Sequence, residues 1–282
     1  MTPPPVVADD RVLTYTRVLA VVIVPFLVVA AVLLYVFPGS TDVTFSWTVV
    51  PAPSAMFLAS AYIGGIWFFL LVLRVGRWHR VRHGFPAVLV FATLAGVATF
   101  LHWDRFHFGH VSFITWVVLY VTTPFLVAAA MLLQRGQDPG SPEERDVDIP
   151  RGWRMLLVVV GLAATVTGLV LFAVPELLVD AWGWELTPLT ARIVGTVLTL
   201  PGMVNVWMLR DARWSAYRWV FQAQLVSLGA ILLAVALASG DLLWDRPAAW
   251  IVTVGFAVSF VAYLAFYLVF DRLARRAAGT AS

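Results

Sequence analysis

Hydrophobic and polar positions divide this chain into eight long apolar stretches separated by polar segments. None of the stretches contains Asp, Glu, Lys, Arg or His. Each has the length of about 17–25 residues with which a helix crosses the hydrocarbon core of a bilayer, whereas a membrane β-barrel shows alternating segments of about ten. The pattern predicts an all-α integral membrane bundle of eight transmembrane helices, over Val18–Phe37, Ala55–Leu73, Phe85–Leu101, Val111–Leu133, Met155–Val174, Ile193–Leu209, Val220–Ala238 and Ala248–Phe270.

Short motifs occur twice along the chain, in the same order and at nearly constant spacing. The segment Arg74-Val-Gly-Arg77-Trp78 returns in the second half as Arg210-Asp-Ala-Arg213-Trp214. Trp103-Asp104-Arg105 returns as Trp244-Asp245-Arg246, and a Pro–Trp–Pro pattern recurs at nearly the same spacing. Self-similarity at a fixed spacing is the mark of a repeated structural unit. The chain therefore reads as a tandem duplication.

The duplication divides the chain into two halves joined by a polar linker. The linker, residues 134–154, contains Pro and Gly, and such segments connect repeats. We expect residues 1–133 and residues 155–282 to form one four-helix repeat each. Because four is an even number, both repeats enter the membrane in the same direction. A pseudo-two-fold axis along the membrane normal should then relate these parallel repeats.

Arginine placement predicts the orientation. Of the 19 basic residues, all of them Arg, only Arg105, Arg192 and Arg246 fall on one side of the eight-helix topology, which leaves 16 on the other side. Cytoplasmic loops carry the excess of basic residues, so we expect a multi-pass cell-membrane protein with cytoplasmic N- and C-termini. The arginines sit at helix ends, which is typical of contact with membrane lipids and gives no indication of nucleic-acid binding. The absence of Cys excludes disulfides and thiolate metal sites.

Helix-breaking residues occur at equivalent depth in both halves. Gly64-Gly65 in the second stretch aligns with Pro201-Gly202 in the sixth, and Asn205 follows one turn later. Paired breakers indicate a binding site in transporters built from repeats. Close helix packing is the alternative, since small residues are common where membrane helices meet. Gly65, Gly202 and Asn205 are candidate substrate-binding residues on the first interpretation.

The two Trp-Asp-Arg turns are the other candidates for ligand contact. Their residues, Trp103, Asp104, Arg105, Trp244, Asp245 and Arg246, are the polar motif repeated on the side opposite the basic loops. They could recognise a polar head group, or they could cap helices through local ion pairs. On the same side, the segment from Pro175 to Glu185 has the pattern of a short amphipathic helix lying in the interface plane.

The histidines fall into two groups. His102, His107 and His110 surround the turn between the third and fourth stretches, where imidazole nitrogens beside a carboxylate are chemically suited to zinc, copper or haem. Their spacing matches no established metal motif, and amphipathic rings also favour the headgroup region. We therefore expect no bound metal or cofactor. His79 and His83 lie in a run of arginines and are expected on a solvated face against anionic headgroups.

The absence of charged residues from the spans limits the functions that the chain can perform. Proton relays and voltage sensors require ionisable groups inside the membrane, so ion-coupled transport is not expected. The chain has no P-loop, no His-Glu-x-x-His, no nucleophile elbow and no Asp-rich diphosphate motif. Polar residues inside the spans, namely Tyr62, Asn205, Gln222, Gln224, Tyr263 and scattered Ser and Thr, are expected to form interhelical hydrogen bonds.

Three segments carry a resemblance: LHWDRFHFGH, LYVTTPFLV and WELTPLTARIVG. They resemble a group of uncharacterised polytopic membrane proteins of actinobacteria. The resemblance covers nearly the whole chain and implies the membrane class. It implies no activity, cofactor or site residue.

The sequence supports three hypotheses for function. The first is non-enzymatic handling of a lipid or other hydrophobic small molecule, without ion coupling, around a central seam between the repeats. The second is a membrane redox protein or enzyme that uses the histidine group His102, His107 and His110. The third is a passive membrane scaffold.

Overall fold

The protein is a bundle of long helices. The computed structural model describes residues 9–144 and 146–279, and within these ranges eight helices are long and apolar enough to cross a membrane. Apart from two isolated bridges, the described residues form no β-structure. The predicted all-α class with eight spans is therefore confirmed. Arg145, one of the 16 arginines expected on the cytoplasmic side, lies outside the described residues.

Seven spans are single α-helices and the sixth is composite. The single helices are α1 (Thr14–Tyr35), α3 (Ala52–Val75), α4 (Phe85–Leu101), α5 (Val111–Leu133), α6 (Arg151–Ala173), α9 (Trp214–Leu237) and α10 (Pro247–Gly279). The sixth span comprises α7 (Pro188–Leu198), α8 (Leu200–Asn205) and the 3₁₀ helix η5 (Val206–Leu209). Short connecting helices are η1 (Pro38–Ser40), α2 (Thr41–Thr44), η2 (Arg82–Gly84), η3 (Trp103–Arg105), η4 (Pro175–Leu177) and η6 (Ser239–Asp241).

Several helices run past the apolar stretches that predict them. The limits of α4 and α5 agree with the prediction, whereas α1 begins earlier, at Thr14, and includes Arg17, and α10 continues through Asp271. Hydrophobicity marks only the part of a helix that faces hydrocarbon, and backbone hydrogen bonding continues into the headgroup region. Long polar side chains reach the interface from such positions.

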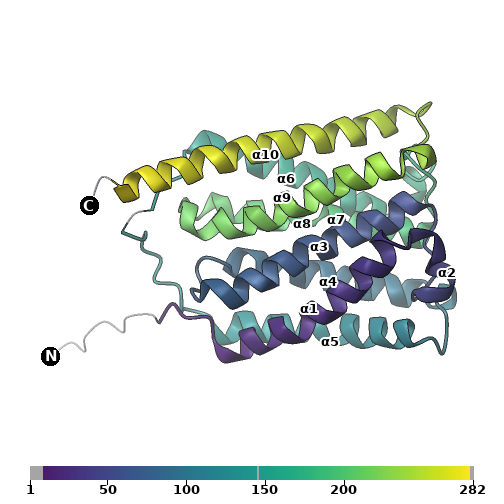
Figure 1. Ribbon diagram of the computed structural model, residues 1–282, viewed down its shortest axis with the longest axis horizontal. Helices are drawn as coiled ribbons and strands as arrows, with labels where there is room; N and C mark the ends of the chain where they lie inside the picture. Colours follow the sequence, from purple (N-terminus) through teal and green to yellow (C-terminus); the bar gives the residue numbers. More distant parts are fainter. Residues whose placement is uncertain (1–8, 145, 280–282) are drawn as a thin grey trace.

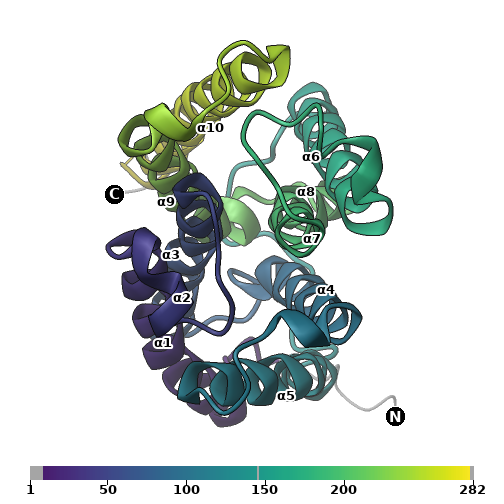
Figure 2. The ribbon, with the colours of Figure 1, turned by 90° about the vertical axis from the view of Figure 1, so that its right-hand side faces the viewer.

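Four spans form the centre of the bundle and four surround it. Viewed along the bundle, α3, α4, α7–α8 and α9 lie inside, and α1, α5, α6 and α10 lie outside (Figure 2). Within the first half α1 packs on α3 and α4 on α5; within the second half α6 packs on α7 and α8, and α9 on α10. The halves meet where α3 packs on α9 and α4 on α7 and α8. A tandem repeat predicts this pairing, and the rotation between the halves stays a prediction.

The bundle has two chemically different ends, and the described part of the chain begins and ends at the same one (Figure 1). We call this the basic end, which also contains residues 76–84, 134–144, 146–150 and 210–213. The opposite tryptophan end contains residues 36–51, 102–110, 174–187 and 238–246. An even number of spans requires this arrangement.

The sixth span breaks where the sequence places a proline, but the second does not break at its glycines. Pro201 has no N–H to donate, and the helix is interrupted at Thr199, whose carbonyl accepts a hydrogen bond from Thr165 Oγ1 at 3.3 Å. In contrast α3 is continuous through Gly64 and Gly65. The two aligned pairs of residues therefore have different effects on the backbone.

The segment after α6 does not form the expected amphipathic helix. Only Pro175–Leu177 is helical, as one 3₁₀ turn, and the rest is irregular. Trp182 and Trp184 are buried, and Trp184 Nε1 donates to Ser54 Oγ at 2.8 Å. The prediction was wrong because these indoles pack inside the protein and not in the headgroup layer.

Candidate functional site

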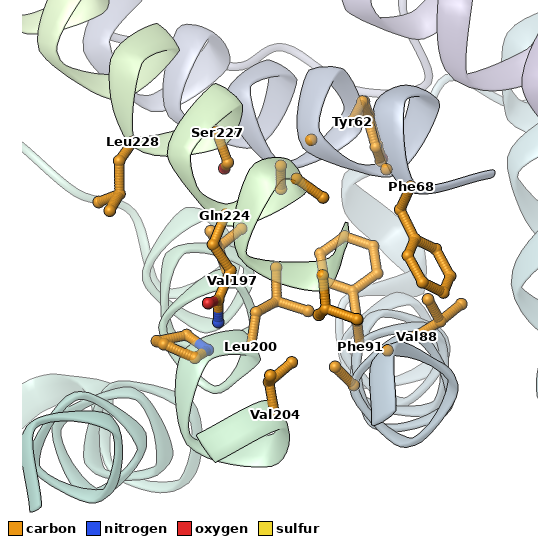
Figure 3. Close-up of a pocket in the computed structure, with 18 of the residues that line it drawn as sticks. Tyr62, Phe68, Val88, Phe91, Val197, Leu200, Val204, Gln224, Ser227 and Leu228 are labelled. Carbon is orange, nitrogen blue, oxygen red and sulfur yellow. The ribbon is translucent and has the colours of Figure 1, made fainter. Parts of the chain in front are cut away.

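A cavity of about 230 Å³ lies between the two halves, half-way along the spans. All eight spans contribute to its wall, and the lining is almost entirely aliphatic and aromatic (Figure 3). Among the described residues, no Asp, Glu, Lys, Arg or His lines it. For comparison, an engineered apolar cavity of about 150 Å³ binds benzene. The volume suits a small hydrophobic molecule or part of a lipid chain, and not a whole phospholipid.

Most polar side chains inside the spans have partners on another helix. Asn205 Nδ2 contacts the Tyr263 hydroxyl at 2.6 Å and the Leu157 carbonyl at 2.8 Å. Gln222 Nε2 donates to the Tyr267 hydroxyl at 2.6 Å, and the hydroxyls of Tyr62 and Tyr120 lie 2.7 Å apart. These contacts are the expected interhelical hydrogen bonds, which join membrane helices.

Gln224 on α9 is an amide side chain without any partner in the described part of the chain, whereas Asn205 lacks a partner only at its Oδ1. Both atoms of its terminal amide are buried, and neither has a hydrogen-bond partner among the described residues. Its side chain lines the cavity and extends from α9 toward Val197 and Leu200 (Figure 3). An unsatisfied buried amide costs roughly 1–3 kcal/mol. Ser227, one turn further along α9, lines the same cavity.

The cavity is partly open, and two of its lining residues are exposed on outer helices. Phe26 on α1 is 39% exposed and Val160 on α6 is 40% exposed, yet both line the cavity. Of the other two outer helices, α5 contributes Tyr120 and α10 contributes Phe256. The outer faces of these helices would lie against lipid tails.

At the basic end the outer helices of each half meet. Tyr15 on α1 donates its hydroxyl to the carbonyl of Leu126 on α5 at 3.1 Å. Trp153 on α6 packs against Phe266 on α10, with ring centroids 5.9 Å apart. These contacts join α1 to α5 and α6 to α10 at the basic end.

The glycines singled out in the sequence have different positions relative to the cavity. Gly65 lines it, and an added Cβ there would meet only the tip of Leu27, at 3.2 Å. A Cβ on Gly202 would collide with Thr165 and with the carbonyl of Gly161, so this glycine permits close packing of α8 on α6. Pro201, its neighbour, lines the cavity instead. Asn205 is fully buried and ties α8 to α10 through Tyr263.

Beyond the cavity, the basic end is closed by a buried ionic cluster. Asp211 accepts hydrogen bonds from His83 at 3.0 Å and from Arg213 at 2.7 Å. Asp138 of the linker accepts from Arg213 at 2.7 Å and lies 2.7 Å from Arg82. The His83 ring stacks on Tyr217 with centroids 4.8 Å apart. The cluster fixes the linker against both halves.

The expected solvated positions of His79 and His83 were wrong. Each side chain is only 3% exposed. His79 lies between the carboxylates of Asp10 and Glu143, and His83 contacts Asp211. Local sequence showed a basic run, but the N-terminal segment and the linker fold over it and supply the acidic partners.

These contacts shift the ionisation of the cluster. Hydrogen bonds from His79 and Arg80 lower the pKa of Glu143 to about 2. Burial would raise the pKa of Asp211, but hydrogen bonds from Arg213 and His83 outweigh it and hold that pKa well below its usual range. Burial likewise would lower the pKa of His79, but its hydrogen bonds to Asp10 and Glu143 raise it. The carboxylates of the cluster are therefore fully charged near neutral pH.

The three histidines at the tryptophan end each have a separate partner. His102 Nε2 lies 2.7 Å from Arg192, and burial together with this cation lowers the pKa of His102. His107 Nδ1 contacts the Phe45 carbonyl at 2.9 Å, and His110 caps α5 by accepting from the Ser112 N–H at 3.2 Å. Within the described ranges, no group of three His, Cys, Asp or Glu side chains could hold a metal ion.

The two Trp-Asp-Arg turns lie at the tryptophan end and do not line the cavity. Asp104 pairs with Arg105 at 3.2 Å in a highly exposed position. Arg246 instead contacts Glu185 at 3.1 Å and the Trp182 carbonyl at 3.2 Å. Asp245 is exposed. The two turns are therefore stabilised by different contacts.

The sequence did not identify Gln224 as a residue that lines the cavity. Gln224 was grouped with the side chains expected to bond across helices, and its position facing the cavity was missed. Its spacing to Ser227 and Val220 places all three on one helical face, and this was the available signal. Only the neighbouring helices determine whether that face meets a protein surface or a cavity.

Comparisons with known proteins add no assignment: no family model, characterised protein or solved structure matches this chain. The resemblance to actinobacterial membrane proteins stays an expectation. The candidate function therefore rests on the cavity and its lining.

Proposed function

We propose that this protein is a non-enzymatic membrane protein that binds and handles a lipid or other hydrophobic small molecule in the central cavity. The observation that carries the proposal is a partly open apolar cavity of about 230 Å³ that is lined by all eight spans, including the exposed Phe26 and Val160 on outer helices. Ligand sites are typically concave, mostly apolar and equipped with a few polar groups. An opening between outer helices would give access to molecules already dissolved in the bilayer.

The lining supports handling without ion coupling. Coupled transporters place ionisable residues inside the membrane, on the substrate or ion path. The cavity wall offers only neutral polar groups, among them Tyr62, Gln224 and Ser227. The separate contacts of the histidine group give no support to a redox site at the tryptophan end.

Orientation belongs to the same proposal. We place the basic end in the cytoplasm of a cell-membrane protein, because it carries most of the arginines. Membrane lipids would then be the partners of the outer helices. Openings between the outer helices would lie about half-way across the bilayer, as the cavity does.

Crosslinking with an apolar photoprobe tests the proposal. Purified protein in phosphatidylcholine nanodiscs is irradiated with a diazirine-bearing decane, and mass spectrometry locates the labelled residues. We expect labels on cavity residues such as Ala223 and Leu228 as well as on the lipid-facing surface. Labels restricted to the lipid-facing surface would contradict the proposal.

A matched pair of variants separates cavity binding from surface labelling. Val88 on α4 lines the cavity, whereas Val97 on the same helix is 41% exposed on the outer surface. Val88→Phe should fill the cavity and reduce internal labelling several-fold, while Val97→Phe should leave it unchanged. Equal internal labelling in the two variants would also contradict the proposal.

A further inference from the structure

We propose that Gln224 orients the ligand through an uncharged hydroxyl, so that the occupant is a neutral hydroxyl-bearing lipid. This inference rests on the proposed function and adds the chemistry of the head group. Its basis is the amide of Gln224, which is buried in the middle of α9 without a partner among the described residues. Buried polar atoms left unpaired in a folded protein call for an explanation such as a ligand.

Two neighbouring amide side chains each have a hydrogen-bond partner, whereas the amide of Gln224 has none among the described residues. Gln222 stands two positions earlier on the same helix and is bonded to Tyr267 at 2.6 Å. Asn205, on α8, is bonded to Tyr263 and Leu157 through its Nδ2. The bundle thus supplies partners for the NH₂ groups of both amides, while the Oδ1 of Asn205 has none within the described ranges. Gln224 is instead one of the residues that line the cavity, and its amide lies beside Val197 and Leu200 (Figure 3).

The amide's own chemistry selects the head group. A primary amide has a carbonyl that accepts and an NH₂ that donates. One hydroxyl can accept from that NH₂ and donate to the adjacent carbonyl, so it satisfies both atoms. An ether or a ketone can only accept, and leaves the carbonyl of Gln224 unpaired. A hydroxyl is therefore the smallest uncharged group that completes the site.

The charge of their head groups excludes the common phospholipids as occupants of the cavity. Their head groups carry a phosphate, and a buried ion without a counter-ion is penalised by several kcal/mol. No charged side chain lines the cavity within the described part of the chain. The apolar remainder of the ligand would lie among aromatic and aliphatic walls such as Phe91, Leu200 and Leu228.

Competition between matched ligands tests the inference. The diazirine-bearing decane is displaced from wild-type protein with decan-1-ol or with decyl methyl ether, and labelling of the cavity residues is measured. A net hydrogen-bond contribution of about 0.5–1.5 kcal/mol predicts that the alcohol competes at a roughly 2- to 13-fold lower concentration. Gln224→Leu should abolish this difference while the decane probe still labels the cavity.

Gln222→Leu is the control, because Gln222 is on the same helix but already bonded to Tyr267. It should retain the preference for the alcohol. Equal competition by alcohol and ether in wild type would overturn the inference, and so would a preference that survives in Gln224→Leu. A bound water on Gln224 would produce the first of these results. In both cases the decane probe would still label the cavity, whereas failure of the proposed function would remove that labelling itself.

Discussion

Trp78 and Trp214 make the same backbone contact in the two halves of the chain. The N–H of Trp78 donates to the carbonyl of Asp10 at 2.9 Å, and the N–H of Trp214 donates to the carbonyl of Val147 at 2.9 Å. In each case the acceptor lies in the segment that leads into the first span of its half. The two tryptophans are almost as far apart in the sequence as their two acceptors.

Neighbouring contacts repeat with nearly the same spacing. The N–H of Val12 donates to the Gly76 carbonyl at 3.0 Å, and the N–H of Ile149 donates to the Ala212 carbonyl at 2.8 Å. The carboxylates of the leading segments recur as well. Asp10 accepts from the His79 N–H and Asp146 from the Ser215 N–H, both at 2.9 Å.

From these recurrences we expect the two halves to superpose by rotation. Residues 18–133 should fit residues 155–270 about an axis near the membrane normal, with Trp78 on Trp214 and Asp104 on Asp245. An experimental structure in a lipid environment provides the measurement. Halves that superpose only after inversion in the membrane plane would refute the parallel repeat.

Removal of the leading carboxylates should destabilise both halves similarly. Asp10→Ala and Asp146→Ala each remove hydrogen bonds to a backbone N–H and to a side chain. We expect a loss of about 1–3 kcal/mol in each variant, because the bonded groups lose their acceptor. Glu144 is exposed at the same end, so Glu144→Ala should change stability by less than about 0.5 kcal/mol. Thermal unfolding in detergent compares the three.

The course of the spans could be predicted because bilayer thickness fixes the length of an apolar helix. The direction of each side chain could not be predicted. Gln222 and Gln224 have the same chemistry, yet two residues along a helix rotate the side chain by about 200°. One consequently meets Tyr267 and the other the cavity.

Contacts between segments that are distant in the sequence could not be predicted either. His79 and His83 are surrounded in sequence by arginines, but in the structure they contact Asp10, Glu143 and Asp211. Those partners come from the N-terminal segment, the linker and the second half. Only tertiary folding brings them together.

Labelling of single cysteines tests the orientation, and the absence of native Cys makes the background clean. Positions near residues 80, 145 and 215 should be protected from a membrane-impermeant maleimide in intact cells, whereas positions near 45, 107, 180 and 243 should react. Suitable exposed sites are Glu144 and Arg210 against Asp42, Asp104 and Asp180. Even one site with the opposite behaviour would disprove the eight-helix orientation.

Docking of the linker should depend on pH in two ways. The pKa of Glu143 falls from 4.5 to about 2 on folding, so its stabilising effect is complete above pH 4.5 and is lost as the pH falls through about 2. The pKa of His79 is raised from 6.5, so its effect is complete below pH 6.5 and is lost as the pH rises through the higher folded value. Docking should therefore be strongest between about pH 4.5 and 6.5.

A spin label at position 144 measures this docking as restricted motion. Label mobility should rise on both sides of that range in the otherwise wild-type protein. Glu143→Gln should weaken docking at all pH values. It should also reduce the change in label mobility on the acidic side of the range. Mobility that stays constant from pH 3 to pH 8 would show that the contacts between Glu143 and His79 do not control docking of the linker.

The Trp-Asp-Arg turns provide the last prediction. Asp104 pairs only with exposed Arg105, and exposed ion pairs contribute about 0–1 kcal/mol. We therefore expect Asp104→Ala, Asp245→Ala and the double variant to unfold nearly as wild type. They should also leave probe labelling of the cavity unchanged, because neither turn lines it. Arg246→Ala should destabilise more, since Arg246 holds Trp182 and Glu185 of the preceding loop. A double aspartate variant that folds normally but loses lipid binding would instead show that the turns select a head group before it enters the cavity.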